Sequence, residues 1–112
     1  MKLVTAIVKP HRVEEVKEAL QGVGVQGLTI SEVRGFGRQR GHTEVYRGAE
    51  YQVEFVPKIR LEVLVAEAMV DEVIDAIVAA ARSGQVGDGK VFVTSVERVV
   101  RIRTGEEDGE AL

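Results

Sequence analysis

A short glycine-rich segment with a lysine at its end could bind a phosphate group. Its sequence, Gly84-Gln85-Val86-Gly87-Asp88-Gly89-Lys90, fits the first seven positions of a Walker A loop. The eighth position is Val91, where that motif needs Ser or Thr to bind magnesium, and the segment runs from a predicted helix into a predicted strand, the reverse of the Walker order. We therefore exclude a P-loop NTPase. Glycines expose backbone N–H groups to an anion, and Lys90 adds a positive charge. Two interpretations therefore remain, a phosphate-binding site and an ordinary helix-to-strand turn.

Two arginines near the end of the chain could hold further phosphate oxygens. Arg101 and Arg103 are two residues apart in a segment, residues 98–103, that we expect to be extended, and this spacing places both guanidinium groups on one side. Guanidinium groups form bidentate, charge-assisted bonds with phosphate. Together with Lys90 they could hold a diphosphate or triphosphate, and the alternative is a solvated surface pair.

A long polar interval lies in the middle of the chain. Residues 37–56 contain Arg, Glu and two tyrosines, Tyr46 and Tyr51. Loops longer than about 12 to 15 residues are uncommon in compact domains and are usually functional or disordered. A tyrosine in such a loop can enter the active site of another enzyme and be modified there. The alternative is an extended hairpin whose charges are solvated.

The periodicity of the apolar residues predicts the elements that position these segments. Strands are predicted at residues 2–8, 28–36, 59–65 and 91–96, and helices at residues 13–23 and 70–81. Two β-α-β units in one chain predict an α+β fold, a ferredoxin-like split βαβ sandwich of order βαββαβ with the long loop between strands 2 and 3. We expect residues 1–112 to form a single domain. Since the strands are apolar on both sides, we expect the second sheet face to pack against other subunits.

Composition and charge exclude several classes of protein. The chain has 112 residues, a net charge of -3 and a pI near 5.4, which argues against a nucleic-acid binder. It has no cysteine, so disulfides and thiolate metal sites are excluded, and the single His11 and His42 make a zinc site improbable. No segment approaches the roughly 20 apolar residues of a membrane span. No catalytic constellation is present, so we predict no catalytic residue and no enzyme, and a cytoplasmic location is compatible with the composition.

Three motifs resemble those of a known family, the PII signal-transduction proteins of the GlnB/GlnK type. Residues 46–51, Tyr-Arg-Gly-Ala-Glu-Tyr, are similar to the modification signature of its T-loop. Residues 84–93 are similar to its B-loop, and residues 101–106, Arg-Ile-Arg-Thr-Gly-Glu, to its C-terminal loop. Residues 35–39 and Lys58 also stand where the family has them. The resemblance places these loops at about residues 37–55, 83–90 and 101–108.

The resemblance implies a homotrimer that binds ATP or ADP in the clefts between neighbouring subunits. Gln39 would ligate Mg2+ together with ATP and 2-oxoglutarate, and Lys58 and Gly87 would complete the 2-oxoglutarate site. The implied nucleotide-binding residues are Thr29, Gly35, Gly37, Arg38, Gln39, Glu62, Leu64, Gly87, Asp88, Gly89, Lys90, Arg101 and Arg103.

The same resemblance implies a nitrogen-regulatory protein that controls partners through its T-loop. Tyr51 would be the site of uridylylation or adenylylation, and Arg47 would enter the pore of an ammonium transporter. Further candidate partners are nitrogen-metabolic enzymes, a nucleotidylyltransferase and a sensor kinase. The protein would associate with a membrane only through the transporter. Ala49 stands where some members carry a phosphorylated serine. Phosphorylation at this position is therefore excluded for this chain. The alternative function is a small phosphate-processing enzyme that uses Lys90, Arg101 and Arg103.

Overall fold

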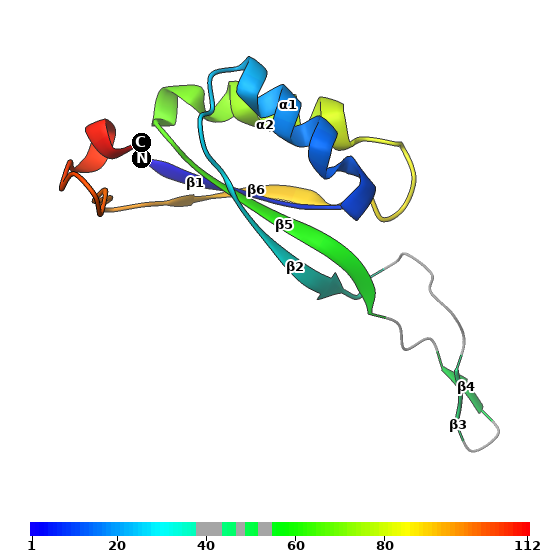
Figure 1. The fold of residues 1–112 in the computed structure, drawn as a ribbon. Coiled ribbons are helices and arrows are strands. Elements are labelled where there is room, and N and C mark those ends of the chain that lie inside the picture. The colour runs from blue at the N-terminus through cyan, green and yellow to red at the C-terminus, as the bar shows by residue number, and fades with distance from the viewer. Residues whose placement is uncertain (38–43, 47–48, 52–54) are drawn as a thin grey trace.

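The computed structural model describes residues 1–37, 44–46, 49–51 and 55–112 (Figure 1). In chain order the elements are β1 (Lys2–Val8), η1 (Pro10–Arg12), α1 (Val13–Gly22), β2 (Thr29–Gly35), β3 (Glu44–Tyr46), β4 (Ala49–Tyr51), β5 (Val56–Val65), η2 (Glu67–Met69), α2 (Val70–Ala81), β6 (Lys90–Ser95) and η3 (Asp108–Ala111). Four strands form one antiparallel sheet in the order β2-β5-β1-β6. This strand order and the two β-α-β units confirm the predicted ferredoxin-like α+β fold.

Both helices cover one face of the sheet, as Figure 1 shows. Side chains alternate between the two faces of a strand, and those buried on the helix side are Val4, Ala6 and Val8 of β1 and Leu61, Val63 and Val65 of β5. Each helix contributes a stripe at helical spacing, Val16 and Leu20 from α1 and Val73 and Ile77 from α2. The largest fully buried side chains of this core are Leu20, Leu61 and Ile77.

The opposite sheet face has no helix over it in the described part of the chain. The strand register places Thr29, Glu62, Thr5 and Phe92 in one row across this face. A neighbouring row carries Leu64 beside Leu3. The side chains of Leu64 and Phe92 are 41 % and 44 % exposed. The second face is therefore partly apolar and open, as the sequence predicts for a surface that packs against another subunit.

One predicted element is wrong. Residues 98–103 do not form an extended strand: Val100 makes an isolated bridge to Glu107, and residues 102–104 form a turn. Arg101 and Arg103 therefore do not gain a common side from strand alternation, which was the reason for pairing them. The physical cause is local, since the N–H of Gly105 donates to the carbonyl oxygen of Arg101 at 2.8 Å and closes the turn.

The long interval contains two short strands among its described residues. Residues 44–46 of β3 pair antiparallel with residues 49–51 of β4, and Glu44 faces Tyr51 in the register. This pairing agrees with the hairpin alternative for part of the interval.

In the described ranges, no helix is long and apolar enough to cross a membrane.

Replacement of Ile77 by alanine tests the core. Ile77 is fully buried, so Ile77→Ala should lower the free energy of unfolding by about 2–5 kcal/mol through lost burial and a residual cavity. Ile102 is 100 % exposed and provides a matched control, because Ile102→Ala removes the same atoms and should change stability by less than about 0.5 kcal/mol. Urea unfolding of both variants measures this difference. Equal losses would contradict the described core.

Candidate functional site

The glycine-rich segment joins the end of α2 to the start of β6, and it is called the B-loop below (residues 83–90). The carboxylate of Asp88 closes this loop on itself. Its Oδ2 accepts hydrogen bonds from the backbone N–H groups of Ser83 at 2.7 Å and Gly84 at 2.8 Å, and its Oδ1 accepts one from the Ser83 hydroxyl. These bonds, those from Ser83 first, hold the pKa of Asp88 well below its usual range. Asp88 is therefore a charged structural anchor of the loop.

The lysine that follows β1 binds the Asp88 carboxylate and so holds the B-loop against the sheet. Lys9 directly follows β1, and its Nζ lies 3.3 Å from Asp88 Oδ1 and 3.4 Å from Ser83 Oγ. The side chains of Lys9 and Asp88 are only 15 % and 23 % exposed, so the pair is partly shielded from solvent. No motif in the sequence indicates that Lys9 contacts the B-loop. The separation of Lys9 and Ser83 by 74 positions in the sequence leaves no spacing signal that predicts the contact.

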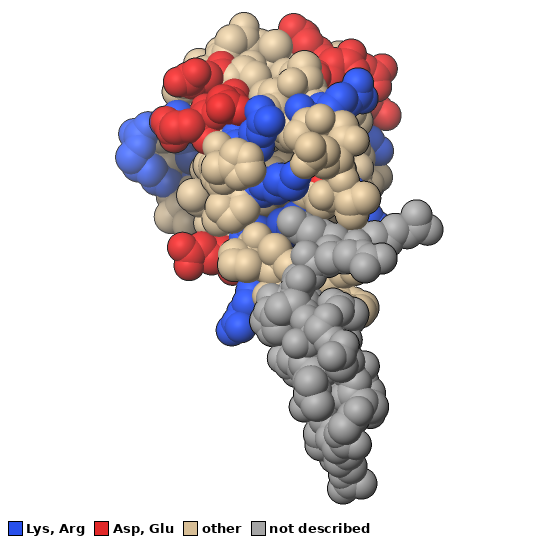
Figure 2. Space-filling view, turned by 90° about the vertical axis from the view of Figure 1, so that its right-hand side faces the viewer, with Lys and Arg blue, Asp and Glu red and all other residues tan. Residues whose placement is uncertain are grey.

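A second lysine reaches the same loop from the strand that follows the long interval. Lys58 of β5 is buried, at 8 % exposure, and its Nζ donates a hydrogen bond to the carbonyl oxygen of Gly87. Burial lowers the pKa of Lys58, and the positive charge of Lys9 lowers it further, while Asp88 acts in the opposite direction. The two lysines therefore form a positively charged pair beside the B-loop. Figure 2 shows Lys and Arg side chains gathered in the middle of this end of the molecule.

Gly89 allows the B-loop to approach β1 closely. Its φ is +102°, a conformation that L side chains rarely adopt, and a Cβ there would overlap the carbonyl oxygen of Ile7. Gly87, with φ +98°, has the same kind of backbone conformation. These glycines place the loop backbone against the end of β1, where the next residue, Lys90, begins β6.

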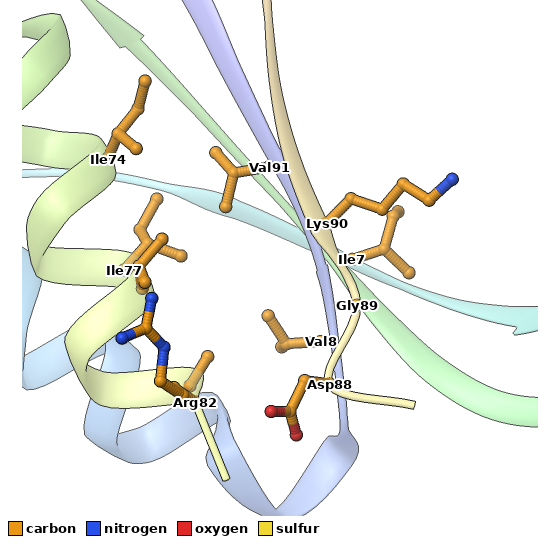
Figure 3. Close-up of a pocket in the computed structure, with 11 residues that line it drawn as sticks. Ile7, Val8, Ile74, Ile77, Arg82, Asp88, Gly89, Lys90 and Val91 are labelled. Atoms are coloured by element: carbon orange, nitrogen blue, oxygen red, sulfur yellow. The ribbon is translucent and has the colours of Figure 1, made fainter. Parts of the chain in front are cut away.

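Lys90 and Ile7 lie opposite each other in the β1–β6 register and point to the same side, as Figure 3 shows. That side is the open sheet face, which also carries the predicted residues Thr29, Glu62 and Leu64. On the other side, a pocket of about 310 Å³ lies between α2 and β6. Its lining is mainly apolar, with Ile74, Ile77 and Val91 among the labelled residues in Figure 3. Lys90 thus directs its charge toward the open face and away from this pocket.

The base of the long interval lies next to Lys58. In the register of β2 and β5, Val33 pairs with Lys58 and Gly35 pairs with Val56. Phe36 and Phe55 then contact each other across the two chain segments, with ring centroids 6.2 Å apart. Gly37 follows at the last described position of the first segment. Lys58 therefore connects the B-loop to the strand pair from which the long interval begins and ends.

Several predicted residues fall outside this description. Arg38, Gln39 and Arg47 lie outside the described residues, and for Tyr51 only its place in β4 is described. The predicted magnesium contact at Gln39 thus stays a prediction. Among the described ranges, no group of three His, Asp or Glu side chains is arranged to hold a metal ion.

Arg101 and Arg103 lie far from Lys90 within one chain. The B-loop is at the start of β6, and the C-terminal turn (residues 99–108) lies beyond its other end, beside the two chain termini (Figure 1). From Lys90 to Ser95, β6 spans about 17 Å, which is five steps of about 3.3 Å. One chain therefore brings Gly87, Asp88, Gly89, Lys90 and Lys58 together but does not add the two arginines to them.

The comparisons with known proteins agree with this arrangement of loops on a ferredoxin-like sheet. A family model described as nitrogen regulatory protein P-II matches residues 1–106. The chain is 58 % identical to nitrogen regulatory protein P-II of Rhizobium etli, 58 % identical to nitrogen regulatory protein GlnK of Escherichia coli K12 and 57 % identical to nitrogen regulatory protein P-II of Azospirillum brasilense. Each match covers 112 residues and 100 % of both chains.

These findings define a regulatory signalling protein and not an enzyme, which removes the phosphate-processing alternative. The chain belongs to the P-II family of nitrogen regulatory proteins. The family resemblance that the three sequence motifs indicated is confirmed over nearly the whole chain.

Replacement of glycine by alanine at two B-loop positions tests the close approach to β1. Gly84 also has a positive φ, +85°, but open space around its missing Cβ, so Gly84→Ala carries only the conformational penalty of about 1–2 kcal/mol. Gly89→Ala carries that penalty plus the overlap with Ile7. We expect it to lose more stability in urea unfolding and to shift the backbone NMR signals of Ile7 and Lys90. Indistinguishable effects of the two substitutions would refute the described contact.

Proposed function

We propose that this nitrogen regulatory protein is a ligand sensor that binds ATP or ADP between subunits and binds 2-oxoglutarate beside Lys58. The T-loop (residues 37–55) then presents the ligand state to partner proteins in the cytoplasm. The observation that carries the proposal is the hydrogen bond from Lys58 to Gly87. It joins the strand that leads out of the T-loop to the loop that would hold the nucleotide.

The nucleotide site is proposed to form between two chains. Lys90 and the B-loop glycines supply one half, and Arg101 and Arg103 of a neighbouring subunit supply the other. The separation of these groups within one chain supports this assignment, because a single chain cannot place both on one ligand. Thr29, Glu62 and Leu64 on the open sheet face would lie around the nucleotide. The partly apolar open face supports a homotrimer, which would cover it.

Lys58 is proposed to bind the distal carboxylate of 2-oxoglutarate. Burial and the positive charge of Lys9 lower the pKa of Lys58, so its partly buried ammonium group favours a nearby anion. A carboxylate ligand would be such an anion, and Mg2+ held by ATP and Gln39 would bind its other end through hard oxygen ligands. The structure of Gln39 is outside the described residues, so this half of the site rests on the family motif.

The proposed output is a shift in T-loop population. Ligands at Lys58 and Gly87 contact the base of the loop, where Phe36 and Phe55 meet, and would favour one loop conformation. Partners recognise the loop, with Arg47 as the contact for an ammonium transporter and Tyr51 as the acceptor for uridylylation or adenylylation. Nitrogen-metabolic enzymes, a nucleotidylyltransferase and a sensor kinase are the other candidate partners.

Calorimetric titration of Lys58→Met tests the proposal. Wild-type protein should bind ATP and ADP, and should bind 2-oxoglutarate only when Mg2+ and ATP are present. Lys58→Met should keep ATP binding and lower 2-oxoglutarate affinity at least about 10-fold, because a charge-assisted hydrogen bond contributes about 1.5–3 kcal/mol.

Lys17→Met is the matched control, since Lys17 is a half-exposed lysine on α1 that pairs with Glu14 at 2.8 Å. It should bind both ligands like the wild type. Failure of the folded wild-type protein to bind either ligand would overturn the proposed function, and unchanged 2-oxoglutarate binding by Lys58→Met would remove Lys58 from the site.

A further inference from the structure

In the C-terminal turn the carboxylate of Glu106 pairs with Arg101, an arginine that the proposed function assigns to phosphate binding. Arg101 Nη1 lies 3.2 Å from Glu106 Oε1, and Arg101 Nη2 donates to the main-chain oxygen of Leu112 at 3.3 Å. The side chains of Arg101 and Glu106 are 39 % and 40 % exposed, so an incoming ligand can reach both. The terminal nitrogens of the guanidinium group are therefore already engaged in the ligand-free chain.

The backbone of the turn enforces this pairing. The N–H of Arg101 donates to the carbonyl oxygen of Glu106 at 2.8 Å, which places the two residues opposite each other as in a hairpin. Two pairs further out, beyond the bridge between Val100 and Glu107, the N–H of Asp108 donates to the carbonyl oxygen of Val99 at 2.7 Å. Gly105, with φ +75°, allows the chain to reverse between them. Glu106 is thus held beside Arg101 by main-chain geometry.

A threonine directs the carboxylate. The hydroxyl of Thr104 donates to Glu106 Oε1 at 2.8 Å, and the backbone N–H of Glu106 donates to the same hydroxyl oxygen at 3.2 Å. The oxygen that accepts from Thr104 is the one that contacts Arg101. This second contact fixes the glutamate side chain in the orientation that neutralises the arginine.

We propose that Glu106 is an internal competitor for Arg101 that sets the affinity of the nucleotide site. The inference rests on the proposed function, because it assumes that Arg101 binds phosphate. A phosphate that binds the terminal fork of the guanidinium group uses Nη1, the nitrogen that contacts Glu106. The carboxylate and the phosphate compete for this nitrogen and repel each other, so phosphate binding is weaker while Glu106 stays in contact with Arg101. A triphosphate carries more charge than a monophosphate and displaces the carboxylate more readily.

Titration of ATP into Glu106→Gln tests this role. Glutamine keeps the size of the side chain and a carbonyl acceptor for Thr104, but it removes the charge that competes with phosphate. A partly exposed ion pair contributes little, so the expected gain in ATP affinity is about two- to fivefold. The gain should be smaller for AMP than for ATP if Arg101 meets the phosphates farthest from the sugar.

The neighbouring residue provides a matched control for net charge. Glu107 pairs with Arg98 at 3.1 Å, both side chains are largely exposed, and neither belongs to the proposed site. Glu107→Gln removes one negative charge from the same turn and measures the general electrostatic gain. The inference requires that Glu106→Gln bind ATP more tightly than Glu107→Gln does.

A double-substitution cycle separates competition from a structural effect. In an Arg101→Gln background, Glu106→Gln should give no gain beyond that of Glu107→Gln, because the competitor has lost its target. A gain of the same size in that background would overturn the inference, as would Glu106→Gln binding ATP no better than Glu107→Gln. If the folded wild type binds no ATP, both the proposed function and the inference fail; if it binds ATP normally without the Glu106 effect, only the inference fails.

Discussion

The length of β6 separates two groups of positive charge that a polyphosphate would need together. Lys90 begins the strand at the B-loop, and the C-terminal turn with Arg101 lies beyond its other end. No rearrangement of side chains spans a six-residue strand and the segment that follows it. A site that uses both groups must therefore lie between two copies of the chain, and the open, partly apolar face of the sheet offers a surface on which those copies can meet.

A buried lysine connects the B-loop to the base of the T-loop. Lys58 lies beneath the B-loop on one side and pairs with β2 on the other, close to the aromatic contact at the loop base. Desolvation of its ammonium group makes the position sensitive to any anion that arrives nearby. Lys9 adds to this effect while it holds Asp88 and the loop in place. The proposed ligand site and the base of the T-loop therefore share a few residues at one end of the sheet.

Sequence periodicity was sufficient for most of the fold, because β1, β5 and α2 have clear two-residue or 3.6-residue patterns. It was wrong for residues 98–103, whose alternating Val, Ile and Arg resemble a strand although Gly105 and Glu106 close a turn. The glycines and Lys90 of the B-loop were visible as a motif. The contacts of Lys9 with Asp88 and of Arg101 with Glu106 were not, because they depend on tertiary placement or on a turn that local patterns did not reveal.

The most direct test of a site shared between chains is complementation between two defective chains. Lys90→Gln lacks the B-loop cation, and Arg101→Gln/Arg103→Gln lacks the C-terminal cations, so neither chain alone should bind ATP well. Co-refolded at equal amounts, the two should form mixed assemblies. Each site needs an intact B-loop from one chain and an intact C-terminal turn from its neighbour, so random assortment should leave about a quarter of all sites complete. Calorimetry should then recover wild-type affinity at that share of sites. Mixed assemblies that form, as shown by co-purification of differently tagged chains, but bind no more ATP than their parents would contradict the account.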